Sequence, residues 1–492
     1  MGFSIPLTVF LLSILVEGLI FLLLRKHRQT VRSISLGNVL LITFSASTIS
    51  IMRPNLFGAV FLLLNLLRLV NTARVAVYRM HRQELYAKYG RTFIFSSVLT
   101  LLTLYLVLKE PSLSGLAVLS TLSLLLSLLI FITLIYSLIK WRYKANEISS
   151  SLDISPTVSV CIPARNETQD LPGCIESVIA STYRKLEILV LDDCSHDKTP
   201  AIIKEYAHDG VRFLKGEEPD ESWMPKNKAM NRLFDEATGE IVVFAGVDVR
   251  FEPDTIGKLV QSLNDDTEMV SVLPQRSSGH ESSLFIQPLR YWWELCVPRF
   301  YTSRPPVLST VWAIKAKTLR NLGEFEAFKK SVQPEAHFAK RLKSKYRFII
   351  AGKKFGVTSV KQPQEQLNTA LRTRYPQSKR RPEVMFTVLL LEILLFIVPL
   401  VTVVHGLSTD NRGLVYLGLV TLLLTGSSNT LVSRLVVYKW WPLTALNTLP
   451  LAVLDMYLLI RSMLAYEFSV VKWKERNICL PMLQVEKELP KL

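Results

Sequence analysis

The sequence predicts an α/β domain with a parallel sheet, inserted between two groups of membrane-spanning helices. Three observations support this fold class. Hydrophobic residues make up 49% of the 492-residue chain, and they concentrate towards both ends. The middle of the chain has no comparable apolar run, and strand-like and helix-like segments alternate there. Basic residues, which give a formal net charge of +17, cluster beside the apolar runs.

The N-terminal region, residues 1–144, is expected to hold about five transmembrane helices, because about 20 consecutive apolar residues are needed to cross a bilayer. The apolar segments are 4–24, 34–52, 55–72, 93–108 and 113–139. The first segment is too long for the core of a signal peptide, and the basic sequence RKHR follows it instead of a cleavage site. We therefore expect it to remain in the protein as a membrane helix.

The basic segments predict how the chain is oriented. With five spans, the segments 25–33, 73–92 and 140–144 fall on one side, which the positive-inside rule makes cytoplasmic. The chain is therefore expected to be an integral protein of the cell membrane, with residues 145–383 in the cytoplasm. Basic residues beside membrane spans also match lipid headgroups, so the charge does not predict nucleic-acid binding.

The C-terminal region, residues 384–492, returns to the membrane after the basic sequence SKRRP. Spans are expected at 385–406 and 412–432. The last apolar stretch, 439–468, is interrupted by Pro442 and Pro450. A single span there would place the basic tail outside, against the charge rule, whereas a re-entrant or interfacial segment would keep it inside. Both alternatives stay open.

The middle region reads as repeated strand–helix units. Strand-like TVSVCIP, EILVLDD and EIVVFAG alternate with helix-like LPGCIESVIA, TPAIIKEYAHDG and PKNKAMNRLFDEA. In such sheets, ligands bind at the carboxyl ends of the strands. Five scattered cysteines without CxxC spacing give no metal motif and read as buried free thiols.

Three predicted strand ends carry polar residues. The first strand runs into residues 163–167, the second ends at Asp192 and Asp193, and the third reaches Asp248. Aspartate is depleted in strands and costly to bury unpaired. One aspartate alone could simply cap a helix, but three such ends together predict a binding site. The absence of GxGxxG and P-loop sequences argues against a dinucleotide or P-loop nucleotide site.

An ordered set of motifs supports a family resemblance. VSVCIPARNE, DDCS, KNKAMN and TGEIVVFAGVDVRFEPDTI follow one another between residues 158 and 260, and STVWAIKAKTLRNLGEF comes later. This set resembles the family 2 glycosyltransferases, whose catalytic domain has the GT-A fold. VVKWKER at 470–476 is similar to the ending of integral-membrane members that modify lipids and carotenoids. The resemblance does not account for the N-terminal helices.

The resemblance implies a role for each strand end. Residues expected to contact the nucleotide part of a donor sugar are Pro163, Ala164, Arg165, Glu167, Asp192, Asp193 and Lys226, with Asp193 at the base or ribose. Asp248 matches the second aspartate of the family's DxD motif and would hold Mg²⁺ or Mn²⁺. The leaving diphosphate carries charge that such a hard cation stabilises.

Two positions depart from the family pattern. Pro334-Glu335 replaces the Glu-Asp pair whose aspartate deprotonates the acceptor, so Glu335 becomes the expected general base. The alternative is an ordinary glutamate in the first turn of a helix that begins with proline. Gly246 stands where DxD has its first aspartate, which removes one potential metal ligand.

Two further segments bear on the acceptor. LRTRY at 371–375 keeps Arg374 of the QxxRW motif of processive synthases but lacks its glutamine and tryptophan, which favours transfer of one sugar. Arg374 is expected near the donor phosphate, although a basic residue before a membrane entry is also ordinary. Trp292 and Trp293, in the aromatic and basic segment 281–306, suit a helix at headgroup level that presents a lipid. The alternative for them is packing in the core.

The sequence thus predicts an inverting membrane glycosyltransferase. It would move one sugar from a nucleotide-sugar, with a UDP-sugar favoured, to a lipid or polyprenyl acceptor in the membrane. A polysaccharide synthase is one alternative, and a membrane protein that binds nucleotide-sugars without catalysis is another.

Overall fold

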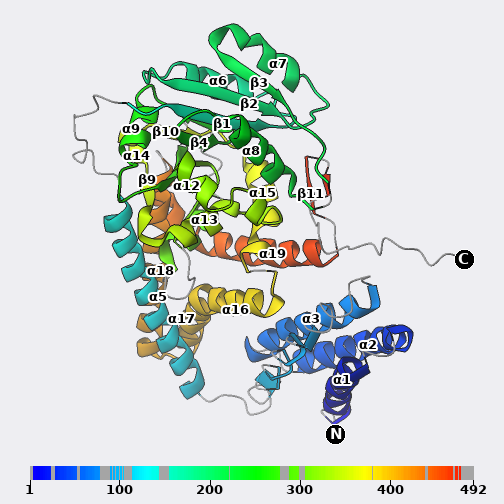
Figure 1. The fold of residues 1–492 in the computed structure, drawn as a ribbon. Coiled ribbons are helices and arrows are strands. Elements are labelled where there is room, and N and C mark those ends of the chain that lie inside the picture. Colours follow the sequence, from blue (N-terminus) through cyan, green and yellow to red (C-terminus); the bar gives the residue numbers. More distant parts are fainter. Residues whose placement is uncertain are drawn as a thin grey trace, which may run out of the picture.

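A computed structural model gives the fold of the chain (Figure 1). With single-residue gaps at 91, 95, 99, 102, 221, 379 and 475, it describes residues 4–23, 28–52, 56–77, 89–104, 113–142, 155–276, 287–297, 305–437, 441–468 and 471–477. The predicted α/β domain between apolar helices is confirmed.

The central sheet has seven strands in the order β3-β2-β1-β4-β8-β6-β9. The strands are β1 Val158–Ala164, β2 Leu186–Asp192, β3 Val211–Lys215, β4 Ile241–Ala245, β6 Met269–Leu273, β8 Val311–Lys315 and β9 Tyr346–Ile350. Strands β1 to β4 pair in parallel, as predicted, but β8 runs antiparallel to both β4 and β6. The sheet is therefore mixed, and the prediction of a wholly parallel sheet is wrong at β8.

Helices cover both faces of the sheet (Figure 1). They are α6 Leu171–Ile179, α7 Thr199–Glu205, α8 Pro225–Glu236, α9 Thr255–Gln261, α10 Gln287–Cys296, α12 Ala316–Asn321, α13 Pro334–Leu342, α14 Gly352–Phe355 and α15 Pro363–Gln377. Several of them, including α8, α13 and α15, have proline in the first turn. Proline suits that position because its missing N–H would have no partner inside the helix.

Two small sheets complete the domain. One joins β5 Val249–Phe251, β10 Val357–Ser359 and β7 Gln275–Arg276. The other is a hairpin near the C-terminus, formed by β11 Lys472–Trp473 and β12 Arg476–Asn477. The three-stranded sheet brings residues far apart in the sequence to the end of β4. The hairpin brings the C-terminal segment back to the α/β domain, where Arg476 pairs with Asp193.

Apolar helices precede and follow this domain. They are α1 Ser4–Leu23, α2 Arg28–Met52, α3 Leu56–Val77, α5 Leu113–Trp141, α16 Pro382–Glu392, α17 Val398–Ser408, α18 Arg412–Val436 and α19 Thr448–Glu467, with a π-helical turn at Ile393–Ile397 between α16 and α17. Within the described residues, five segments are long and apolar enough to cross a membrane: 33–52, 116–141, 382–408, 412–436 and 448–467. The apolar helices at 5–21 and 61–73 are shorter, and the predicted span 93–108 lies partly outside the described residues.

The sheet and two apolar helices share one hydrophobic core. Leu134 of α5 and Val432 of α18 belong to the same buried cluster as Phe244 and Trp312 of the sheet. Leu295 of helix α10 belongs to the same cluster, and its carbonyl accepts a hydrogen bond from Ser137 of α5 at 2.8 Å. The α/β domain therefore packs directly against α5 and α18.

The segment that contains helix α19 starts and ends at the α/β domain. The chain leaves α18 at this domain, where the amide of Gln275 donates to the Leu435 carbonyl, and the hairpin after α19 lies at that domain again. Between these points α19 runs crosswise to α5 and α18 (Figure 1) and packs along α15, with the Tyr375 N–H donating to Ser462 at 3.0 Å. Among the described residues, the hairpin after α19 thus lies on the same side as the α/β domain.

Candidate functional site

The carboxyl ends of β1, β2 and β4 surround two adjoining cavities. We call the first, of about 200 Å³, the inner cavity, and the second, of about 770 Å³, the outer cavity. Five residues line both: Glu167, Val247, Asp248, Lys361 and Arg372. The two spaces therefore meet at the end of β4, beside Asp248.

The inner cavity gathers most of the predicted donor residues. Those that line it are Pro163, Ala164, Arg165, Glu167, Asp193, Lys226 and Asp248. Parallel strands end at one edge of the sheet, so residues far apart in sequence converge there. Lys226 joins them because α8 begins at Pro225, beside this edge.

Asp248 lies in the turn between β4 and β5. Its Oδ2 accepts a hydrogen bond from the Ser359 hydroxyl at 3.1 Å. Burial alone would raise the pKa of this carboxyl, but the positive charges of Lys361 and Arg276 and the Ser359 hydrogen bond outweigh it, so the pKa lies below its usual value. The carboxyl group of Asp248 is therefore ionised at neutral pH.

Gly246 leaves room for that carboxylate. A Cβ atom at position 246 would lie 2.7 Å from Oδ1 of Asp248, closer than two such atoms normally approach. An aspartate at 246 would therefore require Asp248 to move. Among the described residues, no group of three acidic, histidine or cysteine side chains is placed to hold a metal ion, although Glu167 and Asp170 line the outer cavity with Asp248.

The charged groups of Arg165 and Asp192 form hydrogen bonds with backbone groups of the loop after β2. The Arg165 guanidinium donates to the backbone carbonyls of Asp193 and Cys194 at 2.6 and 2.8 Å. Asp192 accepts a hydrogen bond from the Ser195 N–H at 3.2 Å and lines neither cavity. Both side chains thus hold the loop that presents Asp193.

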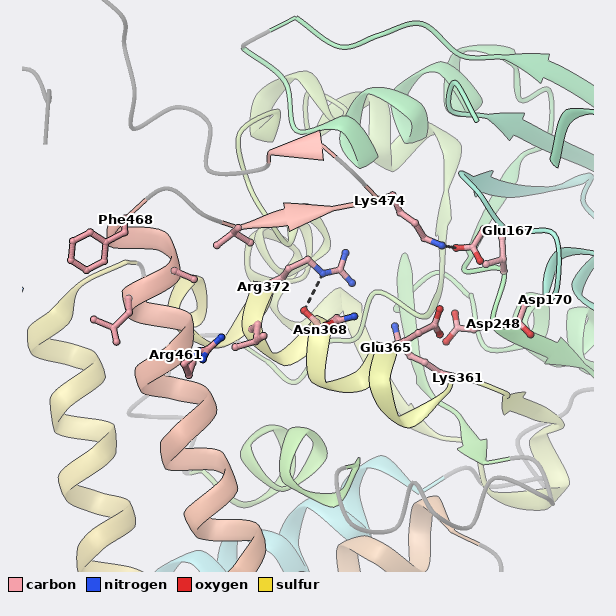
Figure 2. Close-up of a pocket in the computed structure, with 15 residues that line it drawn as sticks. Glu167, Asp170, Asp248, Lys361, Glu365, Asn368, Arg372, Arg461, Phe468 and Lys474 are labelled. Atoms are coloured by element: carbon pink, nitrogen blue, oxygen red, sulfur yellow. Dashed lines mark hydrogen bonds and ion pairs between the residues drawn. The ribbon is translucent and has the colours of Figure 1, made fainter. Parts of the chain in front are cut away.

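The C-terminal hairpin contacts this edge of the sheet. Arg476 pairs with Asp193 at 2.7 Å and with Glu218 at 2.7 Å. Lys474 pairs with Glu167 at 3.0 Å, as Figure 2 shows. Two carboxylates predicted to face the donor are therefore held by the chain's own tail.

Burial perturbs both of these carboxyls. It raises the pKa of Glu167 to about 7, although Lys474 opposes the shift, and it raises the pKa of Asp193 to about 6 despite Arg476. Both groups change charge near neutral pH, as groups at functional sites often do.

We expect Glu167→Gln to stabilise the protein at pH 8 and to have little effect at pH 5. The pKa of Glu167 is about 7 in the folded protein, against an ordinary value of 4.5. Its contribution to stability is therefore fully present below pH 4.5 and is lost as the pH rises through 7. Glutamine, which stays neutral, does not suffer this loss. Because one pKa unit corresponds to about 1.4 kcal/mol, the gain at pH 8 is at most about 3 kcal/mol. Thermal unfolding of the purified full chain at both pH values measures it.

Glu187→Gln is the matched control for that experiment. Hydrogen bonds from Ser159 and Thr238 outweigh the effect of burial on Glu187, so its pKa lies below the usual value. Its stabilising contribution is present at pH 8 and lost in acid, so this variant should be destabilised at pH 8. A lower melting temperature for Glu167→Gln than for the wild type at pH 8 would contradict the expectation.

Glu335 lies in the first turn of α13, beside the wall of the inner cavity. Its side chain is 2% exposed and lines neither cavity, whereas Ser331 and Val332 just before the helix line the inner one. Asn227 fixes this loop by donating to the Ser331 carbonyl at 2.7 Å. The predicted base thus follows the cavity wall by three residues in the sequence, and its own side chain is buried and lines neither cavity.

Arg374 forms a buried ion pair; it lines neither cavity, but with Asp248 and Lys361 it lines a small pocket next to the inner one. Its Nε donates to Asp455 of α19 at 2.8 Å, and the Trp293 indole N–H donates to the same carboxylate at 2.7 Å. Burial lowers the pKa of Arg374 to about 10. Trp292 packs against Phe396 in the core, which is the alternative considered for it; residues 281–286 and 298–304 of that segment lie outside the described residues.

Sequence reasoning missed four basic residues at the site. Lys361 follows strand β10 and faces Asp248, so the pattern of polar residues at strand ends could have identified it. Arg372 lies two positions before the predicted Arg374 in α15, and the structure brings it to both cavities. Lys474 and Arg476 belong to the sequence KWKER, and no local pattern there predicts their ion pairs with Glu167 and Asp193.

Comparison with known proteins identifies the domain. Residues 159–321 match the family described as "Glycosyl transferase family 2". The chain is 28% identical over 116 residues to "Putative glycosyltransferase EpsH" of Bacillus subtilis, covering 24% of this chain and 33% of that one. It is 28% identical over 138 residues to "Undecaprenyl-phosphate 4-deoxy-4-formamido-L-arabinose transferase" of Pectobacterium atrosepticum, covering 27% and 41%. The chain thus spans less than half the length of these relatives.

Two solved structures are also similar. The mannosyltransferase PcManGT from Pyrobaculum calidifontis, in complex with GDP-Man and Mn²⁺, has 18% identity and a TM-score of 0.44, covering 71% of this chain and 97% of that one. Residues 1–349 of S. aureus TarS in complex with UDP have 17% identity and a TM-score of 0.31, covering 63% and 91%.

Proposed function

Because residues 159–321 carry a family 2 glycosyltransferase domain, we propose that the protein transfers one sugar from a nucleotide-sugar to a lipid in its own membrane. One observation carries this proposal. The outer cavity joins Asp248 at the sheet edge to apolar side chains of α19, including Leu464 and Phe468. A donor at the sheet and a lipid along the helix would meet in that space.

The donor occupies the inner cavity in this proposal. Asp193 and Glu167 face the nucleoside, and Lys226 and Lys361 supply positive charge for the diphosphate. A UDP-sugar is the favoured donor. Since Arg476 and Lys474 pair with these carboxylates, the hairpin must yield its contacts, or share them, when a nucleotide binds.

A divalent cation, Mg²⁺ or Mn²⁺, fits at Asp248. Mg²⁺ is commonly held by one or two carboxylates together with substrate phosphates, so one ionised carboxylate is sufficient protein ligation. The cation would stabilise charge on the departing diphosphate. Lys361 stands beside the same carboxylate and adds positive charge from the protein itself.

Glu335 is proposed as the general base. The acceptor hydroxyl would attack the anomeric carbon, the bond from that carbon to the diphosphate would break, and the hydroxyl proton would pass to Glu335. A single displacement of this kind inverts the anomeric configuration. Its support is the position of Glu335, three residues beyond Val332 in the wall of the inner cavity. The side chain must turn towards the cavity to act.

A competing function is binding of nucleotide-sugars without transfer. The burial of Glu335, which keeps the proposed base out of both cavities, is the observation that favours it. A polysaccharide synthase has less support, since LRTRY lacks the glutamine and tryptophan of the processive motif.

Calorimetric titration of UDP and of GDP into the purified full chain, with and without Mn²⁺, tests the donor site. We expect micromolar binding of UDP that depends on the metal. Binding without metal would place the diphosphate on Lys226, Lys361 and Arg372 alone. If neither nucleotide binds, the proposed function fails; if UDP binds but no lipid fraction becomes labelled from any UDP-sugar, the binding-only function replaces it.

A further inference from the structure

Helix α15 forms part of the wall of both cavities. Its residues Thr369, Arg372 and Thr373 line the inner cavity, and Glu365, Asn368, Leu371 and Arg372 line the outer one. The guanidinium group of Arg372 donates to the Asn368 carbonyl at 3.2 Å, as Figure 2 shows, and to the Thr369 hydroxyl at 3.1 Å. Both partners belong to the same helix. The direction of this guanidinium group therefore depends on the backbone of α15 around residue 372.

A proline interrupts the hydrogen bonds of α15 at this point. Pro376 lies inside the last turn of the helix. Because proline has no N–H group, it cannot donate to the carbonyl of the residue four positions earlier, which is Arg372. The Tyr466 hydroxyl of α19 donates to that carbonyl at 2.7 Å. A side chain of a neighbouring helix thus supplies a hydrogen bond that the sequence of α15 removes.

Ser462 of α19 contacts the same stretch of backbone. Its hydroxyl donates to the Leu371 carbonyl at 2.6 Å and accepts a hydrogen bond from the Tyr375 N–H at 3.0 Å. In an uninterrupted α-helix these two backbone groups bond to each other. Insertion of a side chain into this ladder is one of the causes of a helix kink. Two buried hydroxyl groups of α19 therefore determine the backbone of α15 at residues 371 and 372.

Further contacts with α19 fix the end of α15. The Arg374 Nε donates to Asp455 at 2.8 Å, and the Tyr375 hydroxyl donates to Glu467. The two helices lie side by side here (Figure 1). The contacts of Ser462 and Tyr466 thus lie between this fixed end and the part of α15 that lines the cavities.

We propose that Ser462 and Tyr466 are positioning residues for sugar transfer, which place Arg372 where the two cavities meet. Neither side chain lines either cavity, so each acts on the site through α15. Arg372 brings positive charge to the space between donor and acceptor in the proposed function, on which this inference rests. Both residues lie beyond residue 321, where the match to the family ends.

Tyr466→Phe and Ser462→Ala each remove one hydroxyl and test the proposal in the full chain in detergent. We expect kcat/KM for a UDP-sugar to fall about ten- to hundredfold, because a displacement of about 1 Å can cost about 10²-fold. UDP affinity, measured by calorimetry, should fall about five- to tenfold, as for one weakened hydrogen bond. In an Arg372→Gln background neither change should lower UDP affinity further, because coupled residues are not additive.

Tyr183→Phe and Ser137→Ala are the matched controls. The Tyr183 hydroxyl donates to the Pro156 carbonyl at 2.6 Å, and the Ser137 hydroxyl donates to the Leu295 carbonyl at 2.8 Å. Each variant therefore loses a hydrogen bond of the same kind at a place away from α15. Both should leave kcat/KM and UDP affinity unchanged.

Pro376→Ala gives an independent test by rescue. Alanine supplies an N–H group four residues after Arg372, so Tyr466→Phe should lower kcat/KM less in this background than in the wild type. Ser462→Ala should not be rescued, because Ser462 bonds the Leu371 carbonyl and the Tyr375 N–H instead. A general loss of stability would not separate the two variants in this way.

The outcomes separate this inference from the proposed function. If Tyr466→Phe and Ser462→Ala behave like the controls, or lower UDP affinity equally with and without Arg372, the inference is overturned while UDP binding keeps the proposed function. If the wild-type chain binds no nucleotide, both are overturned. Loss of affinity that disappears in the Arg372→Gln background supports the positioning role.

Discussion

Asp248→Asn is expected to lower the rate of sugar transfer about a thousandfold and to leave the fold intact. The change keeps the shape of the side chain and its contact with Ser359, but it removes the negative charge that would hold a cation on the diphosphate. Loss of one electrostatic contact to a developing charge typically costs two to three orders of magnitude, that is, about 10²–10³ in kcat. The rate of label transfer from a UDP-sugar to lipid, with and without Mn²⁺, measures it.

Asp254→Asn provides the control for this substitution. Asp254 is an exposed aspartate of the same domain, paired with Lys258 at 2.7 Å, and its loss should leave the rate within about twofold. Because the pKa of Asp248 lies below its usual value, the wild-type rate should not fall through protonation of this group between pH 8 and pH 6. A transfer rate of Asp248→Asn within about tenfold of the wild-type rate would contradict this expectation. It would show that Lys361 and neighbouring basic residues stabilise the diphosphate without the carboxylate.

Glu335→Gln should abolish most turnover while UDP binding persists. General bases contribute about 10²–10⁴ to a rate, and glutamine keeps the volume of this buried side chain while losing its basicity. Calorimetry with UDP and transfer assays on the same preparation separate the two effects. An exposed glutamate next to the same loop, Glu326, serves as the matched control.

Retained turnover in Glu335→Gln would remove this residue from the mechanism. The carboxylate to test next would be Glu365, which lines the outer cavity from α15. Loss of both turnover and UDP binding would instead indicate that the change disturbs the wall around Val332.

The residues found from sequence are those whose signal is local. A buried strand followed by a polar residue is visible within ten positions, which is why Glu167, Asp193 and Asp248 were predicted together and line one cavity. The parallel order of β1 to β4 follows from the strand–helix alternation in the same way. The resemblance to family 2 glycosyltransferases is confirmed over residues 159–321.

The residues that were missed depend on contacts across the sequence. The partner of Arg374, Asp455, lies 81 positions away on an apolar helix, so no local pattern predicts this ion pair. Hydropathy identifies α19 as a candidate span, because it counts apolar residues and does not register the ion pair between this helix and α15. The tail's contact with Asp193 joins residues 283 positions apart and has no counterpart in any local pattern.

The core that the sheet shares with α5 and α18 limits how this protein can be divided into fragments. A fragment cut at residues 145 and 383 would lose Leu134 and Val432 and expose the apolar face around Trp312 to water. Such a fragment should aggregate instead of behaving as a soluble enzyme. A chimera that borrows a catalytic domain from a relative would need the borrowed α5 and α18 as well, so these parts are expected to change together during evolution.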